Sequence, residues 1–296
     1  MTTTAASRRC TRMASDVARD AAQQSLPPGE LIHIGNDTLA VTIAPHAGGR
    51  IAQIMCEGVT WLASHSDANA AAIAWGSYPM LPWVGRIRHG RFRFGGQAYQ
   101  LPINLGPHAI HGVGFVLPWQ VAAHTSTQIE LILPLPEDER WPFGGTARQR
   151  IAIEGRTLRL ELAVTAGAQA MPKPVLGWHP WFVKPDAIEF RPDAMYPRDG
   201  EGIAVRPLQP PTPGPWDDCF INTHPVLLHR GVQTLRLASD GDHWVIYDEP
   251  VQTTCVEPQS GPPDAFNLDP VALASGATAS TWFTLEWLTG EAKSRD

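Results

Sequence analysis

Apolar and polar residues alternate in short runs along most of the chain after Pro28. In residues 157–164 every second residue is Leu or Val, and the residues between them are mostly polar. Alternation with a period of two is typical of β-strands that bury one face and expose the other. Runs of the same character occupy residues 39–43, 91–94, 128–133, 243–247 and 283–287.

Many short strands separated by turns favour an all-β sandwich or barrel over alternating β-strands and helices. Only residues 14–24 and 67–74 have a helical character, and both segments are short. A proline cluster at 207–215 resembles an interdomain linker, but the same strand pattern continues on both sides of it. We therefore expect a long surface loop there, inside one domain that spans residues 29–290.

Residues 1–28 have a different composition, rich in Thr, Ala, Ser and Arg and poor in large apolar residues. They lack the apolar stretch of a secretory signal peptide. We expect residues 1–28 to form a disordered or weakly helical extension that lies outside the folded domain.

The composition is that of an ordinary soluble globular protein, with 43% hydrophobic and 18% charged residues in 296. The net charge of −6 argues against a general binder of nucleic acid or of anionic membranes. No apolar run approaches the length of about 18 residues that a membrane span requires. The four cysteines show no Cys-x-x-Cys spacing, which favours free thiols in a reducing cytoplasm.

Two candidate acid–base residues each precede a proline. Pro258 follows Glu257 and Pro180 follows His179, so both side chains should extend from strand-like backbone rather than from a helix. Trp178 and Trp181 flank the histidine, and their flat apolar faces suit the C–H face of a sugar ring. An imidazole can donate or accept a proton near neutral pH. Taken singly, each residue could equally be a strand-end carboxylate or a core histidine.

Other polar residues extend this set. His108 and His111 could form a metal site with His179, but no further ligands follow at the spacing of a zinc site, so we expect no metal. Arg86 and Arg88 could bind a sugar hydroxyl or an anion. Adjacent residues in a strand face opposite sides, so only one of Asp217 and Asp218 should point into any one site.

The order of these segments resembles that of the aldose 1-epimerase (galactose mutarotase) family over residues 31–288. The resemblance rests on Gly49-Arg50-Ile51, Gly85-Arg86-Ile87, Ile110-His111-Gly112, His179-Pro180-Trp181-Phe182, Asp217 before Cys219-Phe220, and Cys255-Val256-Glu257 with Pro263 to Asn267.

The resemblance implies a large antiparallel β-sandwich with a sugar cleft, and an enzyme of carbohydrate metabolism that interconverts the α and β anomers of an aldose. It implies that His179 protonates the ring oxygen as general acid and that Glu257 takes the proton of the C1 hydroxyl as general base. His111 would assist at the ring oxygen. Arg86 and Asp217 would hold sugar hydroxyls, with Trp178 and Trp181 beside the sugar.

This chemistry needs a protonated histidine and an ionised glutamate, and it needs no metal, nucleotide or redox cofactor. We expect a monomer or homodimer whose partner is a small sugar. Gly85, Trp178 and Asp218 depart from residues common in galactose-type members, so the sugar is left open, and phosphorylated or sulfonated hexoses are alternatives. A non-catalytic sugar-binding protein and a glycoside hydrolase are the rival functions, the latter needing a second carboxylate near Glu257.

Overall fold

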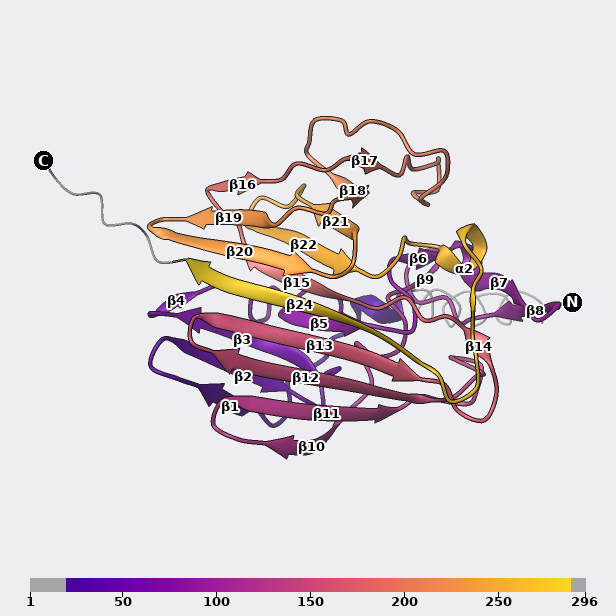
Figure 1. Ribbon diagram of the computed structural model, residues 1–296, viewed down its shortest axis with the longest axis horizontal. Coiled ribbons are helices and arrows are strands. Elements are labelled where there is room, and N and C mark those ends of the chain that lie inside the picture. The colour runs from indigo at the N-terminus through magenta and orange to yellow at the C-terminus, as the bar shows by residue number, and fades with distance from the viewer. Residues whose placement is uncertain (1–19, 289–296) are drawn as a thin grey trace, which may run out of the picture.

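The computed structural model describes residues 20–288, which form two large antiparallel sheets packed face to face. In Figure 1 the eight-stranded sheet lies in front of the ten-stranded sheet. This architecture confirms the all-β prediction and selects the sandwich. Among the described residues, no helix is long and apolar enough to cross a membrane.

The ten-stranded sheet carries the candidate site. Its strand order is β1-β2-β3-β5-β15-β22-β21-β18-β17, and β4 pairs with β3. The strands are β1 (Ile32–Gly35), β2 (Leu39–Ala44), β3 (Arg50–Cys56), β4 (Val59–Thr60), β5 (Ser77–Met80), β15 (Gly177–Val183), β17 (Ala194–Met195), β18 (Asp217–Ile221), β21 (His243–Tyr247) and β22 (Thr253–Gln259).

The eight-stranded sheet closes the other side of the core, in the order β10-β11-β12-β13-β24-β20-β19-β16. The strands are β10 (Gln120–His124), β11 (Gln128–Pro134), β12 (Thr146–Glu154), β13 (Thr157–Thr165), β16 (Ala187–Glu189), β19 (Val226–Arg230), β20 (Gln233–Ser239) and β24 (Thr278–Leu288).

Short elements surround one end of the sandwich. Three two-stranded pairs form there, together with two 3-10 helices and a four-residue α-helix. They are β6 (Arg86–Ile87) with β9 (Ala109–Ile110), β7 (Arg91–Phe94) with β8 (Gln97–Gln100), β14 (Met171–Pro172) with β23 (Ala272–Leu273), η1 (Ala21–Gln23), η2 (Arg88–Gly90) and α2 (Ala265–Leu268).

The core lies between the sheets and follows the alternation of the sequence. Along β13 the residues alternate strictly between buried and half-buried, and the register sets Leu158 opposite Leu285 and Leu160 opposite Phe283. Burial of such side chains stabilises the fold by about 1.5–3 kcal/mol each. The other face of the ten-stranded sheet points away from this core and does not pack against the eight-stranded sheet.

The folded part begins earlier than expected. Residues 1–19 lie outside the described residues, but residues 20–28, which we assigned to the extension, contact the domain. The amide of Ala22 donates to the carbonyl of Asn104, and the amide of Leu26 donates to that of Ala70. The small Ala22 side chain is fully buried, which the low apolar content of the segment did not suggest.

The proline cluster lies in a loop that joins β17 to β18, two paired neighbours in one sheet. Residues 196–216 therefore form a loop within the ten-stranded sheet, not a linker. Residues 67–74, which we expected to be helical, form turns, bends and a β-bridge from Ala71 to Ser25, whereas α2 forms in the loop after β22, where we expected no helix.

Candidate active site

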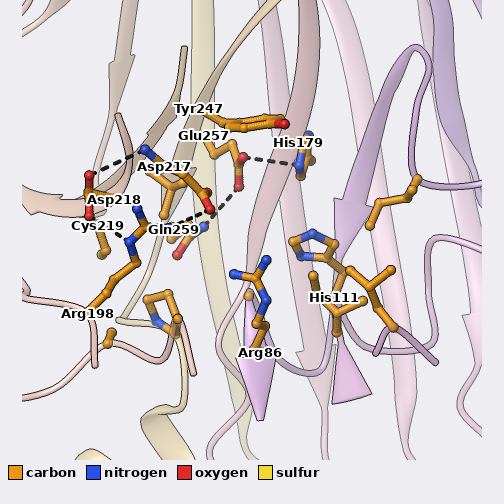
Figure 2. A pocket seen from close by; sticks show the side chains of 18 of the residues that line it. Arg86, His111, His179, Arg198, Asp217, Asp218, Cys219, Tyr247, Glu257 and Gln259 are labelled. Carbon is orange, nitrogen blue, oxygen red and sulfur yellow. Dashed lines mark hydrogen bonds and ion pairs between the residues drawn. The ribbon is translucent and has the colours of Figure 1, made fainter. Parts of the chain in front are cut away.

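A cavity of about 280 Å³ opens on the face of the ten-stranded sheet that points away from the core. Figure 2 shows the side chains that β15, β18, β21 and β22 direct into it. Ligand pockets for small molecules begin at about 300 Å³, so a cavity of this size suits a compact ligand such as a monosaccharide.

The strand register brings His179 and Glu257 together. Strands β15 and β22 pair antiparallel with Gly177 opposite Gln259 and Trp181 opposite Cys255, which sets His179 opposite Glu257 between them. The His179 Nε2 and Glu257 Oε1 atoms lie 3.1 Å apart, and both side chains are buried. The extended backbone predicted for both residues is confirmed, and β22 continues two residues past Glu257 to Gln259.

Burial drives both groups toward their neutral forms, contrary to the expected charged pair. Desolvation lowers the pKa of His179 to about 3, assisted by the nearby positive charge of Arg50. Desolvation, and then the charge of Asp217, raises the pKa of Glu257 well above its usual value. Because the two groups are in hydrogen-bonding contact, we describe them as a pair that shares one proton.

The His179 ring is held between two aromatic rings. Tyr78 stacks on it with centroids 4.8 Å apart, and Trp181 stacks with centroids 5.3 Å apart. The Tyr78 hydroxyl and the Trp181 Nε1 both donate to the carbonyl of Ile73, at 3.2 and 2.8 Å. One backbone oxygen therefore fixes both rings, which restricts the histidine to one orientation. Trp181 also lines the cavity.

Arg50 supports this stack from within the protein. It is fully buried at the start of β3, and its guanidinium donates to four backbone carbonyls, those of Ala47, Ala72, Trp75 and Phe115. It also lies 5.1 Å from the centre of the Tyr78 ring. The Gly49-Arg50-Ile51 motif thus lies behind the site rather than in it.

His111 enters the cavity from a tight turn. Its ring lies edge-on to that of His179, with centroids 5.0 Å apart, and its Nδ1 has no hydrogen-bond partner among the described residues. His111 and Gly112 both have positive φ angles, +59° and +74°. Burial lowers the pKa of His111 well below its usual value, so this ring is neutral at pH 7.

Both Asp217 and Asp218 line the cavity, which corrects our expectation that only one would. Arg198, in the loop 196–216, contacts both of them. It passes the start of β18, and its Nη1 and Nε lie 2.7 Å from Asp217 and 2.9 Å from Asp218. The charge of Asp217 helps to raise the pKa of Glu257, so these two carboxyl groups lie near each other in the cavity.

Arg86 and Arg88, which we considered together, have different surroundings. Arg86 lines the cavity and forms no ion pair within the described residues. Arg88 instead forms ion pairs with Asp199 and Glu201 outside the cavity. The prediction that Arg88 could bind a sugar or an anion is therefore wrong, because acidic residues of the loop occupy its guanidinium.

Two further expectations are corrected. Trp178 points into the core between the sheets, where its Nε1 donates to Gln149 Oε1, because it alternates with His179 along β15. It therefore cannot contact a sugar in the cavity. His108 is not among the cavity-lining residues, and its Nδ1 accepts the amide of His89, so it does not join His111 and His179.

Several cavity residues were not predicted, among them three polar or aromatic ones. Gln259 donates to Glu257 at 3.2 Å, Tyr247 lies on β21 beside Trp181, and Arg198 comes from the loop. Gln259 could have been found from the sequence, since it lies two residues after Glu257 on the same strand face. Arg198 carried no such signal, because its position depends on how the loop folds back.

The chain belongs to the aldose 1-epimerase family, whose sequence model matches residues 30–216. Two proteins of Escherichia coli K12 are similar to it: YihR, 31% identical over 138 residues, and YphB, 31% identical over 108 residues. Both are uncharacterized. The matches cover 45% and 36% of this chain, and 44% and 36% of those proteins, so the chain spans less than half the length of these relatives.

Solved structures with the same fold include a galactose mutarotase-like protein from Clostridium acetobutylicum, with a TM-score of 0.79 and 16% identity over 91% of this chain and 99% of that one. The GalM/aldose epimerase homologue from C. elegans is also similar, with a TM-score of 0.77 and 16% identity over 88% and 99%. At such identities the likeness establishes the galactose mutarotase-like fold.

The turn that presents His111 yields a stability prediction. A Cβ at Gly112 would lie 1.9 Å from the carbonyl oxygen of Leu81, whereas Gly231, with a similar φ of +58°, has open space. Alanine in left-handed backbone costs about 1–2 kcal/mol. Gly112→Ala should lose about 1–3 kcal/mol more than Gly231→Ala because of the clash. Urea unfolding of the two variants measures the difference, and equal losses would show that the turn relaxes freely.

Proposed function

We propose that the chain is an aldose 1-epimerase that interconverts the α and β anomers of a free, uncharged aldose by acid–base catalysis. The observation that carries the proposal is the 3.1 Å contact between His179 and Glu257 on the cavity wall. The family to which the chain belongs supports the reaction class. Membership in that family does not identify the sugar.

Ring opening of a cyclic aldose needs one proton delivered to the ring oxygen and one removed from the C1 hydroxyl. A pair that shares one proton contains both an acid and a base. Transfer of that proton from Glu257 to His179 across their contact creates the imidazolium and the carboxylate. His179 then protonates the ring oxygen while Glu257 accepts the hydroxyl proton, and the aldehyde forms.

The open chain rotates about its C1–C2 bond, and closure on the other face uses the same two groups in reverse roles. Each turnover therefore returns the shared proton to the pair. His111, neutral and edge-on to His179, would hydrogen-bond near the ring oxygen. Arg86, Asp217 and Trp181 remain candidates for holding the sugar, joined by Gln259 and Arg198.

The charges of the cavity favour an uncharged sugar. Two cations line it, Arg86 and Arg198, but Asp217 and Asp218 already neutralise Arg198. Glu249 adds a further acidic group. An anionic sugar would find only Arg86, whose charge also lies near the carboxyl groups of Glu257 and Asp217 and lowers their pKa values.

A rival hydrolase would need two carboxylates flanking a glycosidic bond. Asp217 is the nearer candidate for a second carboxylate, but it and Asp218 each form an ion pair with Arg198. A sugar-binding protein without catalysis would have no use for a buried histidine in contact with a buried glutamate, since burial of both groups is unfavourable unless they act together.

Removal of either member of the pair should abolish most activity. We expect His179→Ala and Glu257→Gln each to lower kcat/KM for anomer exchange at least about a hundredfold, the usual effect of losing a general acid or base. Polarimetry of fresh α-galactose and α-glucose measures the rate. His108→Ala, a buried histidine outside the cavity, is the matched control and should keep most activity. Near-normal rates in both pair variants would contradict the assignment.

The pH dependence should follow the pair. The active form of the pair carries one proton. It takes up a second proton only when His179 is protonated, and the pKa of His179 is lowered to about 3. The active form therefore persists at pH values well below 6.5, the usual pKa of histidine. We expect kcat/KM to be maintained from pH 7 to about pH 5 and to fall only in stronger acid. Measurement in a chelating buffer, corrected for the uncatalysed exchange, tests this. A half-loss near pH 6.5 would show an ordinary solvated histidine.

The charge of the sugar should affect kcat/KM for the exchange of its anomers. We expect kcat/KM for the preferred uncharged hexose to exceed that of its 6-phosphate or 6-sulfonate by at least about tenfold, because like charges face each other in the cavity. NMR saturation transfer with each matched pair at fixed ionic strength provides the comparison. Faster exchange of an anionic sugar, lost in Arg86→Gln, would instead assign Arg86 as its ligand.

A further inference from the structure

A buried thiol completes a set of three metal-ligating groups at the candidate site. Cys255 lies two residues before Glu257 on the same face of β22 and is fully buried. The ligand atoms of His179, Cys255 and Glu257 all lie within 4.8 Å of one another. The proposed reaction uses the histidine and the glutamate but gives the cysteine no role.

We propose that His179, Cys255 and Glu257 form an inhibitory binding site for a thiophilic divalent cation such as Zn²⁺. Inhibition rests on the proposed function, because the ion would occupy the groups that transfer protons. Binding of the ion is independent of the proposed function.

The donor set matches the coordination chemistry of zinc. Nitrogen, thiolate sulfur and carboxylate oxygen are its usual protein ligands, and three of them leave a fourth position open. A tetrahedral ion with bonds near 2.0–2.2 Å holds a nitrogen and an oxygen roughly 3.3 Å apart. His179 Nε2 and Glu257 Oε1 are already 3.1 Å apart, so binding needs little movement of this pair. The thiol must approach by less than about 1.5 Å.

The fold holds the three groups in place and gives an ion a route to them. The antiparallel register sets Cys255 opposite Trp181, diagonal to His179, and the aromatic stack fixes the histidine. His179 and Glu257 line the cavity, so its open space adjoins the fourth coordination position. Gln259 already donates to the second oxygen of Glu257. Such a contact to a ligating carboxylate is common in metal sites.

Binding must release protons. The thiol gives up one proton and the His179–Glu257 pair gives up its shared proton, so one divalent ion replaces two protons and the local charge is conserved. This exchange also explains the inhibition, since the ion removes the proton on which anomer exchange depends. Magnesium, which prefers oxygen ligands in octahedral geometry, should not compete at this site.

Cysteine variants test the site. Zn²⁺ should inhibit anomer exchange by the native chain and Mg²⁺ should not. Cys255→Ser should keep its activity without metal within about threefold, and its half-inhibitory Zn²⁺ concentration should rise at least about tenfold, as expected for a lost ligand. Cys219→Ser is the matched control, because this buried thiol also lines the cavity but lies outside the set of three. It should remain as sensitive as the native chain.

A direct binding measurement separates this proposal from the proposed function. Titration with Cd²⁺ should give an ultraviolet thiolate-to-cadmium band that is lost in Cys255→Ser and retained in Cys219→Ser. Such a band in a chain without epimerase activity would uphold the metal site and reject the function. If Cys255→Ser does not fold, suppression of the Cd²⁺ band in the native chain by His179→Ala provides the test. A band unaffected by either change, or no band, would overturn the proposal.

Discussion

The antiparallel pairing of β15 with β22 is the constraint on which the site depends. Its register sets His179 against Glu257 on the outer face and Trp178 in the core. A shift by one residue would exchange the two faces, burying the histidine in the apolar layer and exposing the tryptophan. The apolar faces that drive the two sheets together therefore also fix the contact between His179 and Glu257. One strand register thus determines both the packing of the core and the geometry of the site.

Burial determines the chemical character of that pair. Two charged groups removed from water cost several kcal/mol each, unless they share a proton and become neutral together. The aromatic stack of Tyr78 and Trp181, with Arg50 behind it, keeps the histidine in contact with the glutamate while excluding water. The same enclosure lowers the pKa of His179 and so makes its protonated form a stronger proton donor.

The sequence was a good guide where local rules apply. Alternation predicted the strands, and the prolines after His179 and Glu257 predicted their extended backbone. It failed where tertiary packing decides. Trp178 points into the core because it alternates with His179 along β15, although its position beside the histidine suggested a sugar contact. The loop 196–216 folds back over the cavity. Its acidic residues therefore form ion pairs with Arg88, and its Arg198 forms ion pairs with both aspartates. No local pattern encodes the path of a loop. The neutral state of the pair likewise depends on burial, which only the assembled sheets create.

The central claim is that this cavity exchanges sugar anomers, and NMR saturation transfer tests it most directly. One irradiates the anomeric proton of the β form and observes the α form, with and without the native chain. The account predicts that magnetisation transfer for at least one uncharged aldose rises in proportion to protein concentration, at neutral pH with a chelator present. Transfer that stays at the uncatalysed rate for every aldose, while those sugars still bind the protein, would contradict it.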